Sequence, residues 1–322
     1  MAKGLPKATF TIPMMMMMTT TTTTMENGGG GGDSCFELPE GCIADVVALT
    51  GPRDACRLSL VASTFRSAAE SDAVWERFLP ADYKDILARA VPDSKPLPPA
   101  SKKDLYLWLS DHPILIDRGT KSFNLEKSSG RKCYMLAARD LAIVWGDTPT
   151  YWRWTPLPDS RFLEVAELVE VCWLEIRGKI STRILSPNTT YAAFLVFKST
   201  AGTHGFEYLP AEVAMGISGC EHKTTAYLDP VSGQGHQNQI VPMGIGPFRR
   251  HTLRRHVAQH REGDNQYPKV REDGWLEVEL GEYFNEGGEE RELEMSVMEV
   301  RGGNWKSGLI IQGIDIRPKV DC

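Results

Sequence analysis

The chain has 322 residues, of which 42% are hydrophobic and 24% are charged, a balance typical of a globular protein that excludes a fully disordered chain. Its length predicts one large domain or two ordinary ones. The net charge of −6, from 36 basic and 42 acidic residues, argues against duplex nucleic acid as the main partner.

Residues 1–34 are of low complexity, with runs of methionine at Met14–Met18, threonine at Thr19–Thr24 and glycine at Gly28–Gly32. Such a segment buries too little apolar surface to offset its ordering entropy, so we predict a disordered tail. The run from Pro13 to Met18 is too short for a membrane span or a signal peptide, and we expect no membrane partner. Met25 is an alternative start.

Residues 35–90 are predicted to be helical. Ile43, Val46 and Val47 recur at helical spacing, and Leu58 and Val61 begin a second periodic run. These helices carry more apolar surface than a unit of this size buries. The pattern fits either a subdomain packed on the rest of the protein or a docking module for a partner.

Residues 91–130 contain four prolines between Pro92 and Pro99, which predict a stiff linker, and then a short helix at Asp104–Leu109. His112-Pro113 ends that helix. We therefore assign 91–130 as a Pro-rich linker with one short helix.

From about residue 131 the apolar residues recur at every second position. Leu174 and Ile176 alternate with charged neighbours, the stretch Tyr191–Phe197 is apolar on both faces, and Leu309–Ile316 is a further apolar run. Short strands separated by Gly and Pro turns predict an antiparallel β-sandwich, jelly-roll-like, over residues 131–318. The fold class is thus α+β, multidomain, with a small all-α unit before the sandwich.

The segment Glu292–Val300 contains a change of phase, because Met298 breaks the alternation set by Leu293 and the residues that follow it. We expect a β-bulge near Val297-Met298, which would bring Glu299 to the same face as Glu292.

Aromatic residues flank a predicted turn at residues 146–149, with Trp145 before it and Tyr151 and Trp152 after it. Core packing explains a single tryptophan well. Aromatic rings beside a loop also form a rigid stacking platform for the apolar faces of sugar rings, and nearby carboxylates accept hydrogen bonds from sugar hydroxyls.

The stretch between residues 202 and 267 offers only weak motifs. Gly216–Cys220 lacks the last glycine of a nucleophile elbow, so serine hydrolase chemistry is not expected. The basic run Arg249–Arg261 fits a solvated loop better than a nuclear localisation signal or a phosphate-binding patch. His256 and His260 are spaced for one helix face but have no third ligand nearby, so we expect neither a metal nor a cofactor.

The seven cysteines are an odd number at irregular spacing, without a Cys-x-x-Cys pair. This usage predicts free thiols in a reducing compartment, the cytoplasm, the nucleus or both.

Residues 36–80 resemble an F-box, in Leu38-Pro39-Glu40, the run Asp54–Val61, Phe65-Arg66 and Trp75-Glu76. F-boxes bind the Skp adaptor of cullin–RING ubiquitin ligases. The resemblance, extended to an F-box at 35–90, implies that Trp75 holds the helices together and that five residues contact the adaptor: Leu38, Pro39, Ile43, Leu58 and Val61.

Residues 131–318 resemble the phloem protein 2 lectins, in the blocks Ala137–Trp145, Pro149–Trp154, Trp173–Ile180 and Asp273–Glu277. These Nictaba-like plant lectins are β-sandwiches that bind GlcNAc oligomers and N-glycan cores. The resemblance implies a carbohydrate site made of four residues: Trp145, Trp152, Glu292 and Glu299.

The order of these segments resembles plant F-box proteins of the phloem protein 2-B type. The resemblance implies a substrate-recognition subunit of a Skp–cullin–F-box ubiquitin ligase, itself non-catalytic, whose lectin domain recruits glycoproteins. The alternative is a receptor that recognises protein surfaces and retains a vestigial sugar site. A glycosidase would need paired carboxylates, which Glu292 and Glu299 supply only on a single strand, so an enzyme is not expected.

Overall fold

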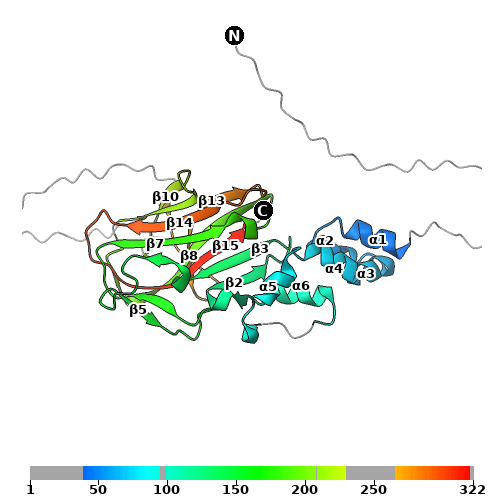
Figure 1. The fold of residues 1–322 in the computed structure, drawn as a ribbon, viewed down its shortest axis with the longest axis horizontal. Helices are drawn as coiled ribbons and strands as arrows, with labels where there is room; N and C mark the ends of the chain where they lie inside the picture. The colour runs from blue at the N-terminus through cyan, green and yellow to red at the C-terminus, as the bar shows by residue number, and fades with distance from the viewer. Residues whose placement is uncertain (1–38, 95–98, 208, 230–264, 320–322) are drawn as a thin grey trace, which may run out of the picture. The chain divides into compact units, whose positions relative to one another are not determined.

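The computed structural model describes residues 39–94, 99–207, 209–229 and 265–319 (Figure 1). The tail predicted at 1–34, Leu38, and the basic run with His256 and His260 lie outside the described residues. Across the described ranges, no helix is both long and apolar enough to cross a bilayer. The cysteines within these ranges are all free thiols.

Helices occupy the first part of the described chain: α1 (Glu40–Val47), α2 (Pro52–Leu58), α3 (Ser63–Glu70), α4 (Asp72–Phe78), α5 (Tyr83–Ala88) and α6 (Lys102–Asp111). The second periodic run is divided, because Leu58 ends α2 and Val61 lies in the turn before α3. Pro52 stands at the first position of α2, where its missing N–H costs nothing. Ser101 caps α6 by accepting a hydrogen bond from Asp104 N at 3.1 Å.

Trp75 fills the space between these helices and is 1% exposed. Its indole N–H donates to Ala69 O at 2.6 Å, and its ring meets Phe78 edge-on with the centroids 5.5 Å apart. The ring therefore holds helices together, as the sequence predicted.

The strands of the described chain form two sheets. One sheet has the order β1 (Ile114–Ile116), β2 (Lys121–Leu125), β3 (Lys132–Ala137), β15 (Ser307–Pro318), β8 (Thr189–His204), β13 (Leu276–Asn285) and β12 (Lys269–Val270), with β6 (Val165–Leu168) and β5 (Trp152–Thr155) joined through β15. The other has the order β11 (Asn265–Gln266), β10 (His222–Ala226), β9 (Ala211–Ile217), β14 (Glu292–Glu299), β7 (Leu174–Ser181) and β4 (Ala142–Ile143). Short 3-10 turns lie at Pro92–Ser94, Asp117–Gly119, Ala138–Asp140 and Thr182–Ile184.

The two sheets pack face to face, which confirms the antiparallel β-sandwich. Every described strand pair except β10–β11 is antiparallel. Gly178 of β7 lies so close to the opposite sheet that a Cβ there would come within 2.9 Å of Ile314 of β15. Alternate residues of the strands meet in the main core between the sheets. Strands β3 and β8 are buried on both faces, and a second apolar cluster that includes Met135, Val196 and Trp275 lies apart from that core.

The segment 91–130 differs from the predicted linker. Its helix is present and extends over Lys102–Asp111, but β1 and β2 follow it. β1 pairs with β2, and β2 pairs with β3. The sandwich therefore takes in strands that precede residue 131. Both strands are short, and Ile114, Ile116, Phe123 and Leu125 are buried, so burial and pairing outweigh the weak local pattern.

The bulge expected in β14 is absent, and that expectation was wrong. β14 pairs with β7 at every position from Glu292 to Glu299 without a register shift. Shifts occur instead in β13, between Glu279 and Gly281, and in β15. Met298 stays on the outer face beside Arg177, and Glu299 takes an inner position, so no bulge is needed.

An ion network ties together β13 and β15 of the first sheet. Arg271 donates to Glu277 and Asp315, at 2.9 Å each, and Arg317 bonds both carboxylates at 2.6–3.0 Å. Burial opposes ionisation of Asp315, but the charges of Arg271, Arg161 and Arg317 outweigh it and hold its pKa below the usual range. The charged groups of this network are thus committed to the fold.

Gly313→Ala should lower the free energy of unfolding by about 2 kcal/mol or more. The new Cβ would lie 1.9 Å from Leu136 O and force β15 and β3 apart. Gly41→Ala is the control, since nothing lies within 4 Å of its Cβ position and alanine favours a helix. Chemical denaturation measures both. Equal stability of the two variants would contradict the close approach.

Candidate functional site

Large apolar side chains are exposed on the first two helices and the turns that follow them. The exposed fractions are 53% for Val46, 81% for Leu49, 79% for Leu60 and 70% for Val61. We call these four residues the apolar helical surface. Scattered apolar residues are ordinary on a surface, but four in a stretch of sixteen residues mark a candidate interaction site.

The predicted adaptor-binding residues divide between the surface and the core. Pro39 and Val61 are exposed, whereas Ile43 and Leu58 are half-buried and pack against the core. Sequence reasoning did not assign Val46, Leu49 or Leu60 to the site. Helical periodicity placed Val46 in an apolar stripe, but it does not say which edge of a stripe remains uncovered.

Trp145 lies in the turn after β4 and is 44% exposed. Its backbone φ of +58° is in the left-handed region, which a bulky residue adopts only when its surroundings enforce it. Its ring packs against Tyr151, with the centroids 5.2 Å apart. The pair offers an aromatic surface at this turn.

Trp152 supports that turn from inside and is only 2% exposed. Its indole N–H donates to Val144 O at 3.2 Å, and the indole of Trp154 donates to Gly146 O at 2.9 Å. These carbonyls stand on either side of Trp145. The two indoles therefore hold the strained backbone in place.

Glu292 and Glu299 lie at opposite ends and on opposite faces of β14, about 23 Å apart along the strand. Glu292 is exposed and pairs with Lys179 at 2.8 Å, which also holds Glu294 at 2.9 Å. Glu299 is paired with Leu174 of β7. Val144 N, in the residue before Trp145, donates a hydrogen bond to the carbonyl of the next residue of β7, Glu175. Trp145 therefore lies at the Glu299 end of the sheet.

Glu299 is buried in an ion pair with Lys306, and the two residues are 4% and 0% exposed. Glu299 also accepts from Gly302 N at 3.0 Å, and Lys306 Nζ donates to Asn304 O at 2.8 Å and Cys172 O at 3.1 Å. Burial lowers the pKa of Lys306. This pair orders the loop between β14 and β15.

The four predicted carbohydrate-binding residues therefore do not meet on one surface. Trp145 and Glu292 reach solvent, at different ends of the sheet, and Trp152 and Glu299 do not. The expected bulge was the reason for placing both glutamates on one face, and its absence separates them. Sequence reasoning also left out Trp173, which is 43% exposed and donates from its indole N–H to Glu175 at 2.9 Å.

Known proteins match both halves of the chain. Residues 131–318 match the family described as Phloem protein 2. F-box protein PP2-B10 of Arabidopsis thaliana is 44% identical over 282 residues, covering 87% of this chain and 92% of that protein. F-box protein PP2-B1 of the same plant is 43% identical over 305 residues, covering 88% and 89%.

Among solved structures, a xylan-binding domain from Paenibacillus barcinonensis is 11% identical and covers 58% of this chain and 87% of that domain, with a TM-score of 0.24 that supports no argument. The sequence matches are decisive. They show a protein with a phloem protein 2 domain, and the chain belongs to the plant F-box proteins of the PP2-B type within that family.

Lys306→Met should cost about 3–5 kcal/mol of stability, because it leaves the Glu299 carboxylate buried without its cation. Lys179→Met removes an ammonium group from the exposed Glu292 and the half-buried Glu294 of the same strand and should cost no more than about 1 kcal/mol.

Thermal and chemical unfolding compare the two variants. Glu299→Gln combined with Lys306→Met should recover part of the loss, because the unpaired charge is gone. Equal costs for Lys306→Met and Lys179→Met would show that Glu299 and Lys306 do not form a buried pair.

Proposed function

We propose that this protein is the substrate-recognition subunit of a Skp–cullin–F-box ubiquitin ligase. The observation that carries the proposal is the apolar helical surface, and the F-box names of the relatives supply the class of partner. Burying an exposed Leu or Val side chain is worth about 1.5–3 kcal/mol, so burial of these four residues would favour binding of a partner. The partner is the Skp adaptor, and the compartment is the cytoplasm or the nucleus.

In this proposal the protein transfers no ubiquitin itself. It holds a target close to the ligase and so raises the local concentration of the target's lysines. Residues at 35–90 serve as the F-box, and the sandwich selects the target.

The sandwich is proposed to bind glycans, such as GlcNAc oligomers or N-glycan cores on glycoproteins. Support comes from Trp145 and Tyr151, whose paired rings are presented by a turn that Trp152 and Trp154 hold rigid. A fixed indole offers a large contact area at a small cost in entropy. Trp152 and Glu299 act in this proposal as positioning residues rather than as ligands.

A second candidate is a receptor for protein surfaces with a vestigial sugar site. The buried positions of Trp152 and Glu299 favour it, because their roles in the fold explain their presence without any sugar.

Leu60→Asp combined with Val61→Asp should weaken binding to a purified Skp adaptor at least tenfold, because two exposed apolar side chains would be replaced by charges that must be desolvated. Calorimetry or biolayer interferometry gives the affinity. The unfolding temperature should change little, since both side chains are exposed.

Leu163→Asp is the matched control, because Leu163 is 85% exposed in the loop between β5 and β6. It should bind the adaptor like the wild type. If the double variant also binds like the wild type, the apolar helical surface is not the docking site.

Trp145→Ala should lower the glycan-array signal of the full chain about tenfold, because the ring that stacks on a sugar is lost. It should leave the unfolding temperature nearly unchanged, because the ring is half exposed. Trp145→Phe should retain part of the signal, since a ring still stacks. A wild-type chain without any glycan signal would favour the second candidate.

A further inference from the structure

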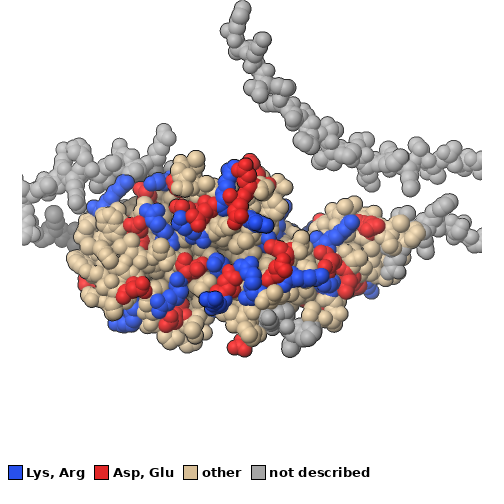
Figure 2. Space-filling model, in the orientation of Figure 1, with Lys and Arg blue, Asp and Glu red and all other residues tan. Residues whose placement is uncertain are grey.

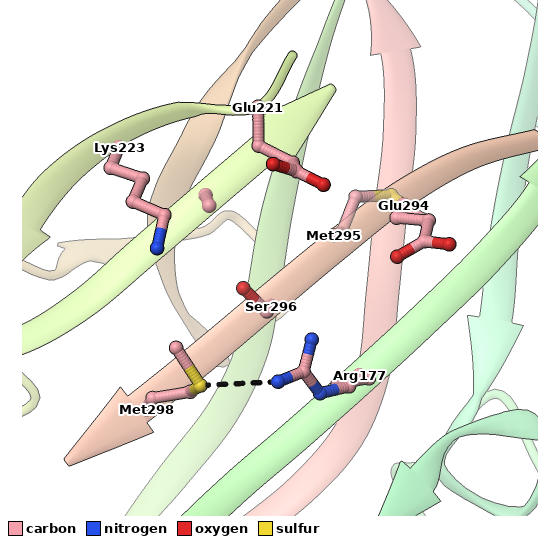
Figure 3. A pocket seen from close by; sticks show the side chains of 8 residues that line it. Arg177, Glu221, Lys223, Glu294, Met295, Ser296 and Met298 are labelled. Carbon is pink, nitrogen blue, oxygen red and sulfur yellow. Dashed lines mark hydrogen bonds between the residues drawn. The ribbon is translucent and has the colours of Figure 1, made fainter. Parts of the chain in front are cut away.

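A pocket of about 170 Å³ opens on the outer face of the sheet that contains β14 (Figure 3). Ser296 of β14 and Ala214 of β9 form its floor and are paired across the two strands. Arg177 of β7 borders one side, and Lys223 of β10 borders the other, next to Glu221. Small side chains in the middle and long ones on both sides make a trough across the sheet.

The hydroxyl of Ser296 has no partner among the described residues, although the residue is only 8% exposed. Figure 3 shows its oxygen pointing into the space between Arg177 and Lys223. A buried polar group normally finds a hydrogen bond in the folded protein. The Ser296 hydroxyl faces the open pocket and is therefore free to bond a ligand that enters it.

The trough is balanced in charge. Lys179 pairs with Glu292 and Glu294, and Lys223 pairs with Glu212 at 3.0 Å. Arg177 pairs with Glu175 at 2.7 Å. Acidic and basic side chains are interspersed over the face of the molecule in Figure 2. Within the pocket lining itself, Arg177 and Lys223 stand against Glu221 and Glu294, so neither sign is in surplus to attract a phosphate or a polycation.

The lining still has unused hydrogen-bonding capacity. Arg177 uses Nε on Glu175 and one Nη on the thioether of Met298, out of five N–H donors. Glu221 uses Oε1 to accept from Gly219 N, at 3.0 Å. Donors and acceptors are therefore both present around the unpartnered hydroxyl, which suits a ligand whose groups both donate and accept.

Trp173 extends this lining along β7. Its indole N–H and the guanidinium of Arg177 both bond Glu175, so Trp173, Glu175 and Arg177 form one chain of contacts on the outer face. The four residue steps from Trp173 to Arg177 cover about 13 Å. An exposed aromatic ring with its orientation fixed thus stands at one end of the polar trough.

We propose that this trough, together with Trp173, binds an uncharged oligosaccharide. One sugar ring stacks on Trp173, and the next ones exchange hydroxyl hydrogen bonds with Arg177, Ser296 and Glu294. The inference rests on the proposed glycan binding and assigns it a site distinct from Trp145 and Tyr151.

A peptide strand fits this face less well. Peptides that join a sheet use the free backbone groups of an edge strand, but β14 and β9 are paired on both sides. Recognition on this face therefore depends on side chains, whose donors and acceptors can bond sugar hydroxyls.

The test uses the full chain, a glycan array and titration with N,N′,N″-triacetylchitotriose. Ser296→Trp should fill the trough and lower the affinity at least tenfold, and Trp173→Ala should lower it about tenfold. Ser296→Ala should have a smaller effect than Ser296→Trp. Phe284→Ala is the matched control, because Phe284 is an equally exposed aromatic residue, 52%, on β13 of the other sheet.

The outcomes separate the two proposals. If the wild type binds glycans and both Ser296→Trp and Trp173→Ala bind them equally well, the trough is not the site, although glycan binding stands. If the wild type binds no glycan on the array, both proposals fail together. Trp173→Ala keeps the test valid if Ser296→Trp unfolds, since the Trp173 ring is exposed and its loss should leave the unfolding temperature nearly unchanged.

Discussion

The uninterrupted pairing of β14 between β7 and β9 decides what the second sheet presents to solvent. Because neither pair contains a register shift, odd-numbered residues from Leu293 to Glu299 face the core and even-numbered ones face outward. Because of that alternation, Glu299 points inward and pairs with Lys306. Glu292 and Glu294 point outward and pair with Lys179. The alternation also places Ser296 in the centre of the outer face, where its neighbours across the sheet are Arg177 and Ala214.

The buried ion pair changes how the site residues suggested by resemblance should be understood. Glu299 bonds Gly302 N and Lys306, and Lys306 reaches back to Cys172 O, just before Trp173. A carboxylate so engaged has little capacity left for a sugar hydroxyl, and its removal would leave a buried ammonium group unpaired. Loss of binding in a Glu299 variant would therefore not identify a ligand contact, and neither would loss in a variant of the buried Trp152.

Much of the architecture was predictable because local patterns agree with it. Most of the helices and the antiparallel sandwich follow from apolar periodicity of 3.6 and 2 residues, whereas the role of Trp75 followed from the resemblance to an F-box. The strands β1 and β2 could not be predicted in this way, because segments of three and five residues are too short to show a clear alternation. The prediction of a bulge was wrong for a different reason. Alternation alone does not show that Lys306, seven residues further along the chain, supplies a cation that offsets the cost of burying the Glu299 carboxylate. The sequence placed Ser296 and Trp173 on strands but did not assign them to a site, because alternation does not show which outward side chains line a pocket.

A trough in which every cation already has a carboxylate partner should bind sugar weakly, since a hydroxyl must compete with existing ion pairs and with water. Weak binding is compatible with a ligase receptor. In the proposed function, an adaptor held by the apolar helical surface would keep the ligase near its target, and a glycoprotein with several glycan branches would offer the sandwich repeated encounters. Selectivity then depends on the joint presence of the Trp145–Tyr151 pair and the Trp173 trough. A glycan long enough to reach both would gain avidity that neither surface provides by itself.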